Sequence, residues 1–381
     1  MNDNRGVTSL WLDEANAEAD AWSPTTTDPG ERVDVAIVGA GVTGCACALA
    51  LAQRGVSVAV YEARRIAGGA SGRNGGFALR GAAPAYDEAR ERFGRDRARE
   101  LWELSERALD RMELLAGDAL RRRGSLRLAV DEQELEALRR EHDALREDGF
   151  AVEWVAHPDG RCADLFAGGL RHPGDGSLDP VRWVRRLAGL AARNGATFHE
   201  GHAVERIDAL PAERILVATD GYTHGLVPEL DAAIAPARGQ VVATAPLAER
   251  LFDVPHYARH GYDYWQQLED GRLVVGGWRD AALEAETTRA EAVTPAIQER
   301  IEAFLVALLG ELPAITHRWA GIFGVTESKL PYVGPLARDE QIWVAAGYSG
   351  HGNVLGLACG ELVGRALAGE HVPELDLFDR L

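Results

Sequence analysis

The sequence predicts a mixed α/β fold (α+β) in which a domain with a parallel sheet is interleaved with a domain built on an antiparallel sheet. Three observations predict it. A strand, a glycine-rich turn, a helix and a second strand follow one another across residues 33–62. Residues 238–280 alternate apolar and polar side chains as antiparallel strands do, with a hairpin turn near Asp270 and Gly271. The chain closes with a buried strand, a glycine loop and a helix across residues 342–367, so elements of the parallel type stand at both ends.

The composition excludes several classes of protein. At 381 residues the chain has room for about two domains, and its 46% hydrophobic and 26% charged residues are typical of a globular protein. A net charge of −18 argues against nucleic acid or an anionic membrane as partners, because both need a basic surface. No run of about 18 apolar residues is present and the first five residues lack a leader pattern, so we expect a cytoplasmic protein without a membrane span.

Local signals predict the remaining elements. Residues 1–30 are polar and form a lead-in arm, which Trp11 and Trp22 dock onto the body. Asp131 and Glu134 form a capping box at the start of a helix that ends at Gly149. The other predicted helices cover residues 41–54, 84–123, 180–193 and 294–309, and the predicted strands cover 33–38, 56–62, 124–130, 150–155, 196–199, 214–219 and 342–346.

The strongest functional signal is the turn Gly39-Ala40-Gly41-Val42-Thr43-Gly44 between the first strand and the first helix. Gly39 permits the tight turn, Gly41 lets a pyrophosphate approach the backbone, and Gly44 lets the helix and strand pack closely. Glu62 closes the next strand, where a carboxylate accepts from both hydroxyls of an adenosine ribose and repels a 2′-phosphate. The order of strand, glycine turn, helix, strand and acidic residue predicts a Rossmann-like dinucleotide site, and the carboxylate of Glu62 disfavours NADP.

Two further glycine-rich segments favour FAD over a nicotinamide cofactor. Residues 63–76 stand where a nicotinamide domain would enter another helix, and their backbone N–H groups and small side chains suit a diphosphate and a planar ring. Residues 347–354 precede the last helix, whose N-terminus would stabilise negative charge on a reduced flavin. Either segment alone is also compatible with an ordinary loop or turn.

Together these segments resemble the D-amino-acid oxidase-like family of FAD-dependent oxidoreductases, and within it the glutamylputrescine oxidase-like branch, related to the sarcosine and glycine oxidases. The resemblance implies oxidation of the C–N bond of a small primary or secondary amine or amino acid to an imine, by hydride transfer to flavin N5, with hydrolysis of the imine. It implies an FAD domain of residues 31–85, 160–232 and 326–381, and a substrate domain of residues 86–159 and 233–325. The matching segments are residues 39–44, Glu62, 68–76, Leu178-Asp179-Pro180, Arg238-Gly239-Gln240 and 347–353.

The resemblance also assigns roles to single residues. Glu62 would hold the adenosine ribose, and Val204 would offer its backbone to the adenine. Arg64 and Ser71 would lie near the diphosphate. The full set of predicted cofactor contacts is Gly39, Gly41, Val42, Thr43, Gly44, Glu62, Ala63, Arg64, Gly69, Ala70, Ser71, Arg73, Asn74, Gly75, Gly76, Val204, Thr219, Gly321, Gly347, Gly350, His351, Gly352, Asn353 and Val354.

The resemblance places residues 73–76 and 350–353 at the edge of the flavin ring. The surroundings of this ring depart from the family pattern. Relatives with a covalent flavin carry a cysteine near Gly321, so we expect FAD to be held non-covalently. Sarcosine oxidases place a lysine beside the flavin where this chain has Val274, which leaves open whether O2 or another electron acceptor is used. Residues 326–329 replace a Thr-Pro-Asp that is common in relatives, so we expect a divergent substrate side.

The substrate site should be apolar and aromatic, because only the neutral form of an amine is oxidised and desolvation favours that form. Alternation along the antiparallel sheet places Tyr262, Tyr264 and Gln266 on one face, and the resemblance turns Tyr264 toward the flavin. Tyr257, His260 and Trp265 are further aromatic candidates, each of which could equally be a packing residue.

Charged residues complete the predicted site. Arg73, Arg279 and Arg318 are the candidates to clamp a substrate carboxylate. Lys329 is the single lysine of the chain, and we expect it to be exposed unless it serves the substrate. The residues predicted to be catalytic are Tyr264, Arg279, Lys329 and His351, although a structural hydrogen bond is the simpler role for His351. No metal is expected, because Cys45, Cys47, Cys162 and Cys359 lack ligand spacing and suit buried positions.

Two other functions remain open at this point. One is an FAD-dependent hydroxylase or halogenase that shares the N-terminal βαβ unit, which the loop of residues 347–353 disfavours. The other is a flavin-carrying binding subunit without turnover. The sequence leaves open the amine, the electron acceptor and whether the chain is a monomer or a homodimer.

Overall fold

The computed structural model describes residues 8–17 and 28–381. A six-stranded sheet in it contains strands from the N-terminal and the C-terminal parts of the chain. Its strand order is β16-β17-β10-β1-β2-β9, and all neighbours are parallel except the hairpin of β16 and β17. The near-continuous apolar sequence of these strands suits burial on both faces. The strands are β1 (Val33–Val38), β2 (Val58–Glu62), β9 (Thr197–Glu200), β10 (Ala212–Val217), β16 (Tyr332–Leu336) and β17 (Asp339–Ala346).

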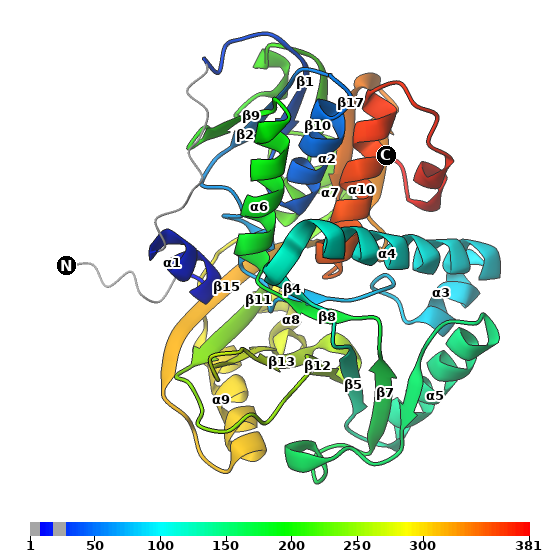
Figure 1. Ribbon diagram of the computed structural model, residues 1–381, viewed down its shortest axis with the longest axis vertical. Coiled ribbons are helices and arrows are strands. Elements are labelled where there is room, and N and C mark those ends of the chain that lie inside the picture. Colours follow the sequence, from blue (N-terminus) through cyan, green and yellow to red (C-terminus); the bar gives the residue numbers. More distant parts are fainter. Residues whose placement is uncertain (1–7, 18–27) are drawn as a thin grey trace.

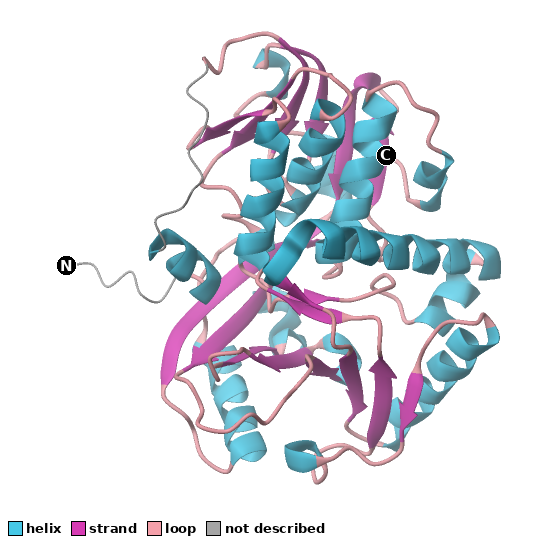
Figure 2. Ribbon diagram, viewed as in Figure 1, coloured by secondary structure: helices cyan, strands magenta, loops and turns pink. Residues whose placement is uncertain are grey.

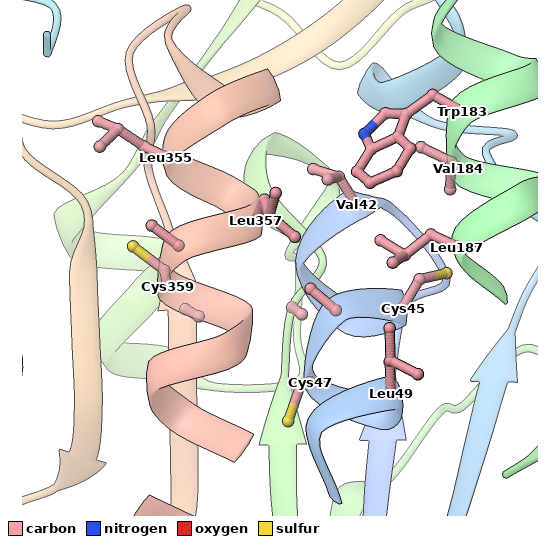
Figure 3. Close-up of a cluster of buried hydrophobic side chains, with 14 of the residues drawn as sticks. Val42, Cys45, Cys47, Leu49, Trp183, Val184, Leu187, Leu355, Leu357 and Cys359 are labelled. Carbon is pink, nitrogen blue, oxygen red and sulfur yellow. The ribbon is translucent and has the colours of Figure 1, made fainter. Parts of the chain in front are cut away.

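Three helices, α2 (Val42–Ala52), α6 (Pro180–Arg193) and α10 (Gly352–Leu367), lie side by side on one face of this sheet (Figure 1). Gly356, Gly360 and Gly364 of α10 leave no room for side chains against α2, since a Cβ at Gly360 would lie 2.4 Å from the carbonyl oxygen of Thr43. This close contact joins segments from opposite ends of the chain. Figure 3 shows the apolar side chains between the helices, with Cys45 and Cys47 pointing to opposite sides of α2.

An eight-stranded sheet forms the other half of the molecule, with the order β15-β11-β14-β13-β12-β5-β7-β6. Its pairs are antiparallel except β12 with β5, and Gly271, at φ 91°, makes the predicted turn between β13 and β14. Figure 2 shows this sheet below the first one, with helices on its outer side. Its elements are β5 (Ser125–Ala129), β6 (Glu153–Val155), β7 (Gly168–His172), β11 (Ala235–Thr244), β12 (His256–Ala258), β13 (Asp263–Gln267), β14 (Leu273–Gly277) and β15 (Ile315–Val325), with α5 (Glu132–Glu147) and α9 (Pro295–Leu309).

Smaller elements join the two halves. A three-stranded sheet contains β3 (Phe77–Ala78), β8 (Gly176–Leu178) and β4 (Leu120–Arg121). The short helices α7 (Pro228–Ala233) and α8 (Leu283–Glu286) lie in connections. No helix long and apolar enough to cross a membrane occurs in the described parts of the chain.

The long helix predicted over residues 84–123 is wrong in its extent. The structure has α3 (Tyr86–Phe93) and α4 (Arg95–Ala116), separated by Gly94 at φ 85°, a value that breaks a helix. Gly117, at φ 59°, then ends α4 before β4. The strand predicted over residues 150–155 is shorter, because only β6 pairs with β7.

The predicted boundary at residue 160 also differs from the sheet pairing. β7, which falls in the segment 160–232 assigned to the FAD domain, pairs with β5 and β6 of the eight-stranded sheet. A division that follows the sheets therefore groups β7 with the antiparallel half. Antiparallel pairing across a helix and a loop leaves no signal in local sequence, so this boundary was not visible in the chain.

The N-terminal arm contains a short helix, α1 (Leu10–Ala17), that docks beside α6 and the eight-stranded sheet (Figure 1). Trp11 is buried, as predicted, and its Nε1 donates to the carbonyl of Asn74 at 2.9 Å. Trp22 lies outside the described residues. The capping box of α5 is confirmed in its main bond, since the Asp131 side chain accepts from the N–H of Glu134. The Glu134 carboxylate reaches one residue further back and accepts from the N–H of Val130.

Candidate active site

A cavity of about 560 Å³ lies where the two halves meet. One end is lined by backbone from three segments: the start of α2, residues 70–75 and residues 348–354. The other end is lined by side chains of the eight-stranded sheet and of the connections around α3 and α4. We call the first end the cradle and the second end the side-chain end.

The turn before α2 has the geometry that its glycines predict. Gly39 has φ 104°, and a Cβ at Gly44 would lie 1.9 Å from the carbonyl oxygen of Gly39, so neither position accepts a side chain. Ser71 covers the N-terminus of α2, because its Oγ accepts from the N–H of Val42 at 3.0 Å. Backbone N–H groups and the helix dipole favour an anion at this place.

Glu62 at the end of β2 is held by the backbone on both sides. Its two carboxylate oxygens accept from the N–H groups of Ala40 and Arg64, each at 2.9 Å. Burial raises the pKa of Glu62, and these bonds act against that rise. A carboxylate fixed in this way still has lone pairs to offer to ribose hydroxyls.

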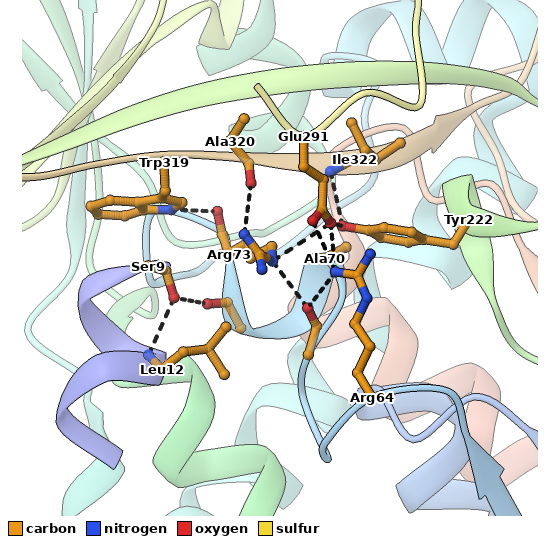
Figure 4. A network of polar contacts seen from close by, with 12 residues as sticks. Ser9, Leu12, Arg64, Ala70, Arg73, Tyr222, Glu291, Trp319, Ala320 and Ile322 are labelled. Atoms are coloured by element: carbon orange, nitrogen blue, oxygen red, sulfur yellow. Dashed lines mark hydrogen bonds and ion pairs between the residues drawn. The ribbon is translucent and has the colours of Figure 1, made fainter. Parts of the chain in front are cut away.

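Polar contacts fix the segment of residues 64–74 against β15 (Figure 4). Arg64 pairs with Glu291 at 2.8 Å, and its guanidinium also reaches the carbonyl of Gly68. Arg73 donates to the carbonyls of Gly68 and Ala320. Tyr222 donates to Glu291, which therefore joins all three side chains.

Asp220 holds the loop of residues 347–354 in place, a role that the sequence did not predict. It follows β10, lies half-buried against the loop, and accepts from the N–H groups of Gly324, Gly347 and Tyr348. Burial raises its pKa, which these bonds lower in part. The hydroxyl of Thr43 donates to Tyr348 at 2.9 Å, which links the loop to α2. The signal available was an acid directly after a strand that enters the cleft.

The predicted cofactor residues divide into two groups. Those that line the cavity are Gly41, Val42, Thr43, Ala70, Ser71, Arg73, Asn74, Gly75, Gly321, Gly350, His351, Gly352, Asn353 and Val354. Those placed around it, in the turns of the parallel sheet or behind the cradle, are Gly39, Gly44, Glu62, Ala63, Arg64, Gly69, Gly76, Val204, Thr219 and Gly347.

Aromatic side chains from the antiparallel sheet line the side-chain end, as expected. Tyr262 and Tyr264 both line the cavity, and Gln266 on the same face donates to the carbonyls of Gly75 and Gly76. Trp265 points the other way into the core and stacks on His256, so it is a packing residue. Burial raises the pKa of Tyr264, which keeps its phenol neutral.

Of the three candidate arginines, Arg279 is the one that lines the cavity without a carboxylate partner in the described part of the chain, so it is available to a ligand. Its guanidinium lies over the rings of Tyr262 and Phe323, at 4.9 and 5.4 Å, with no carboxylate within 4.0 Å among the described residues. Arg73 lies 3.6 Å from Glu291 and donates to two backbone carbonyls. The expectation for Arg318 is wrong, because it pairs with Glu302 and Gln298 outside the cavity lining.

Lys329 is not an exposed lysine. It lines the cavity half-buried, at φ 68°, and burial together with the charges of Arg279 and Arg92 lowers its pKa. Arg92 donates to the carbonyl of Glu327 in the same loop. The side-chain end therefore has three cations close to one another in a strongly acidic protein.

A group of buried polar residues deeper in the cavity was not predicted. Arg80 pairs with Asp175 at 3.0 Å, Arg127 pairs with Glu141, and His172 lies among them. These residues belong to no motif, and their helices and strands are far apart in sequence, so nothing local reveals them. The group also contains Tyr257 and faces His351, whose pKa burial lowers to about 4.

The residues of the cradle fit an FAD. Gly75 is buried in the cavity wall, and its amide N–H has no acceptor in the described chain, as a donor to a ligand would have none. A Cβ at Gly41 would lie 2.9 Å from Ser71 Oγ, so only glycine brings the backbone to the cavity surface at this position. No group of three or more acidic, histidine or cysteine residues suited to a metal occurs among residues 8–17 and 28–381. Fold and site together define an enzyme that works with a dinucleotide cofactor.

Comparison with known proteins identifies the family. The family model described as FAD dependent oxidoreductase (DAO) matches residues 34–366. The chain is 30% identical to the Probable oxidoreductase OrdL of Rhizobium meliloti, over 93% of this chain and 87% of that one. It is 29% identical to the gamma-glutamylputrescine oxidoreductase of Escherichia coli, over 92% and 87%. The crystal structure of glycine oxidase from Geobacillus kaustophilus matches with a TM-score of 0.74 at 25% identity, over 91% and 96%. The chain belongs to the family of FAD-dependent oxidoreductases, as its motifs predicted.

Proposed function

We propose that this enzyme uses a non-covalently held FAD to oxidise the C–N bond of a small primary or secondary amine or amino acid. The observation that carries the proposal is one continuous cavity that joins the glycine-lined cradle to a wall of aromatic side chains. The names of two relatives, gamma-glutamylputrescine oxidoreductase and glycine oxidase, refer to compounds with amino groups. A bound FAD would supply the acceptor for a hydride from the carbon next to nitrogen, and water would hydrolyse the resulting imine to a carbonyl compound and ammonia, or an amine where the substrate is a secondary amine.

The side chains of this chain prepare the amine. Phe77 and Tyr264, whose rings meet edge to face at 5.7 Å, exclude water and favour the neutral amine over its ammonium form. His351 adds no charge to this site near neutral pH, because burial lowers its pKa to about 4. We assign Tyr264 and His351 to binding and orientation of the substrate, with no charge of their own.

Arg279 would bind a carboxylate of the substrate. A guanidinium that lies on two aromatic rings and has no protein carboxylate nearby can donate to a ligand carboxylate in bidentate fashion. Arg279→Met should raise KM for a carboxylate-bearing amine by about 10- to 100-fold with a smaller change in kcat, and should leave KM for an amine without a carboxylate nearly unchanged. Arg318→Met, outside the cavity, is the matched control.

The absence of a thiol near the cradle supports non-covalent binding. All four cysteines are buried in the core and none lines the cavity, and a Cβ at Gly321 would already lie 2.8 Å from Cβ of Arg73. Acid precipitation should release all of the flavin into the supernatant. Colour that stays with the precipitated protein would contradict this part of the proposal.

Anaerobic titration tests the reaction itself. The yellow holoenzyme is mixed with a panel of amines, with and without a carboxylate, and the loss of flavin absorbance is recorded before air is admitted. We expect bleaching by amines. Bleaching by NADH or NADPH alone would indicate a hydroxylase, and bleaching by neither would indicate a binding subunit. The rate at which air restores the colour decides between O2 and another electron acceptor. The resemblance to sarcosine oxidases expects a lysine at the position of Val274, which is a buried apolar residue in this chain.

A further inference from the structure

Five consecutive carbonyl oxygens in and directly behind the cradle, those of residues 72–76, accept hydrogen bonds from side chains that are distant in sequence. The donor groups belong to three places in the chain: α1 with the residue before it, β13 and β15. They are Ser9 Oγ to Gly72 (2.6 Å), Trp319 Nε1 to Arg73 (2.9 Å), Trp11 Nε1 to Asn74 (2.9 Å), and Gln266 Nε2 to Gly75 and to Gly76 (3.0 Å).

The donor side chains are themselves buried. Ser9 and Trp319 have no exposed surface, and Trp11 and Gln266 are each 3% exposed. A buried donor that loses its acceptor cannot turn to water, so each bond strongly favours one orientation of its peptide unit. The carbonyls of the segment are therefore held away from the cavity by the surrounding protein.

The N–H groups of the same residues have the opposite arrangement. Gly72 and Arg73 donate within the turn to Gly69 and Ala70, and Gly76 donates to the Asn74 side chain at 2.8 Å. Asn74 and Gly75 are the two residues of the segment whose N–H groups have no acceptor in the described chain, and both residues line the cavity. Fixed carbonyls thus leave two adjacent donors available to a ligand.

The helix α1 is anchored strongly enough to act as a support. Arg185 of α6 donates to the carbonyl of Ala15 at 2.8 Å. On the other side, Arg272 pairs with Glu14 and His317 lies 3.3 Å from Asp13. The helix is therefore bound to both halves of the molecule, and its Ser9 and Trp11 reach the cradle between them.

We propose that α1 is part of the cofactor site: Trp11 is a positioning residue that fixes the N–H group of Gly75 against the flavin, beside the N–H group of Asn74, whose peptide Trp319 fixes. Ser9 is a positioning residue for the preceding peptide, between Gly72 and Arg73. Donors held at this edge stabilise the negative charge of the reduced ring more than the neutral oxidised ring, so they raise both the affinity for FAD and its reduction potential. The inference rests on the proposed placement of the flavin ring in the cradle and requires no particular substrate.

The test uses Trp11→Phe in the full-length holoenzyme, which keeps an aromatic ring and removes the N–H. We expect the FAD dissociation constant to rise about tenfold, the equivalent of one hydrogen bond. The reduction potential of the flavin should fall and its visible absorbance should shift. Trp343→Phe is the matched control, because Trp343 also donates from Nε1 to a carbonyl, that of Glu340 at 3.0 Å, but does not line the cavity.

Ser9 gives an independent second test. Ser9→Ala should change the potential and absorbance in the same direction but by less, because Ser9 holds the peptide that precedes the two free donors. Ser9→Thr, which keeps the hydroxyl, should restore both. If Trp11→Phe does not fold, this pair of variants decides alone. A lower melting temperature with unchanged potential, absorbance and FAD affinity would show a merely structural helix and overturn the inference. A wild-type protein that binds FAD but is bleached by no amine would refute the proposed function and leave this test intact.

Discussion

At the cradle, main-chain atoms of Gly41, Gly75 and Gly350 reach the cavity surface, whereas at the side-chain end Tyr264, Arg279 and their neighbours present long side chains. The cradle is formed by peptide groups that only glycine exposes, and such a surface is read in the sequence as a glycine motif. The side-chain end is assembled from single residues of separate strands and helices. The comparison explains why the cofactor is evident from the chain while the amine is not.

The largest expected effect on cofactor binding tests the cradle. Gly44→Ala places a Cβ 1.9 Å from a backbone oxygen of Gly39, so α2 must shift away from β1. We expect loss of bound FAD after dialysis and a fall of about 3 kcal/mol in the free energy of unfolding, from absorbance ratios and urea titration. Gly189→Ala in α6 is the control, because its Cβ would meet only Arg193 at 3.4 Å and alanine favours a helix. Retention of FAD by Gly44→Ala would refute the role of this contact.

The next effect tests whether the side-chain end has its own rigid support. Glu286 accepts from Arg238 at 2.7 Å and from Gln240 at 3.0 Å, on either side of Gly239 in the cavity wall. Glu286→Gln leaves the buried guanidinium without its counter-charge, and we expect a loss of about 3–5 kcal/mol in the free energy of unfolding by urea titration.

Glu213→Gln provides the control for this ion pair. Glu213 lies 3.8 Å from Arg32 with most of its side chain exposed, so its substitution should change stability by less than about 0.5 kcal/mol. If Glu286→Gln and Glu213→Gln have equal effects, the network does not support the sheet.

A third effect concerns pH. His256 is buried against Trp265, with Nδ1 2.7 Å from the carbonyl of Val254, and burial lowers its pKa to about 4. The folded state therefore binds fewer protons than the unfolded state between pH 6.5 and 4. The stability that His256 contributes is complete above about pH 6.5 and is lost as the pH falls, by about 3 kcal/mol.

His256→Phe keeps the stacking and removes the titration. The free energy of unfolding, measured by urea at pH 7 and at pH 4.5, should fall less steeply in this variant than in the wild type. His224→Phe is the control, since the His224 side chain is 76% exposed. An identical pH slope in the His256 variant and the wild type would contradict this assignment.

The contrast between the cradle and the side-chain end also explains how much of the protein could be predicted from the sequence. Gly39 to Gly44, Glu62 and the terminal glycine loop lie in local patterns whose spacing has a physical reason, and the structure shows the turn, the strand end and the loop that these patterns predict. Their roles toward the cofactor stay predictions. The capping box at Asp131 and the turn at Gly271 are local in the same sense. Gly94 shows the opposite case, because a helical pattern continues on both sides of it and hides the break.

The side-chain end could be predicted only in part. Strand alternation placed Tyr262 and Tyr264 on the correct face, yet which arginine faces the cavity depends on the pairing of β11 with β14 and β15. The deep residues Arg127 and Asp175 are brought together by tertiary contacts alone. Of the contacts between α1 and the cradle, the sequence indicated only that Trp11 docks onto the body of the protein.

The smallest expected effect separates charge from backbone strain at Lys329. Lys329→Met removes the charge and keeps the stem, so KM for a carboxylate-bearing amine should rise about threefold or less while stability stays nearly unchanged, since Arg279 still provides the main cation. Lys329→Gly removes both the charge and the cost of φ 68°, so it should raise KM equally and add about 1 kcal/mol to the free energy of unfolding. Steady-state kinetics and urea titration measure the two quantities. If Lys329→Met lowers kcat or the rate of flavin reoxidation by tenfold, the lysine takes part in chemistry, and the side-chain end then contains a reactive group as well as a binding surface.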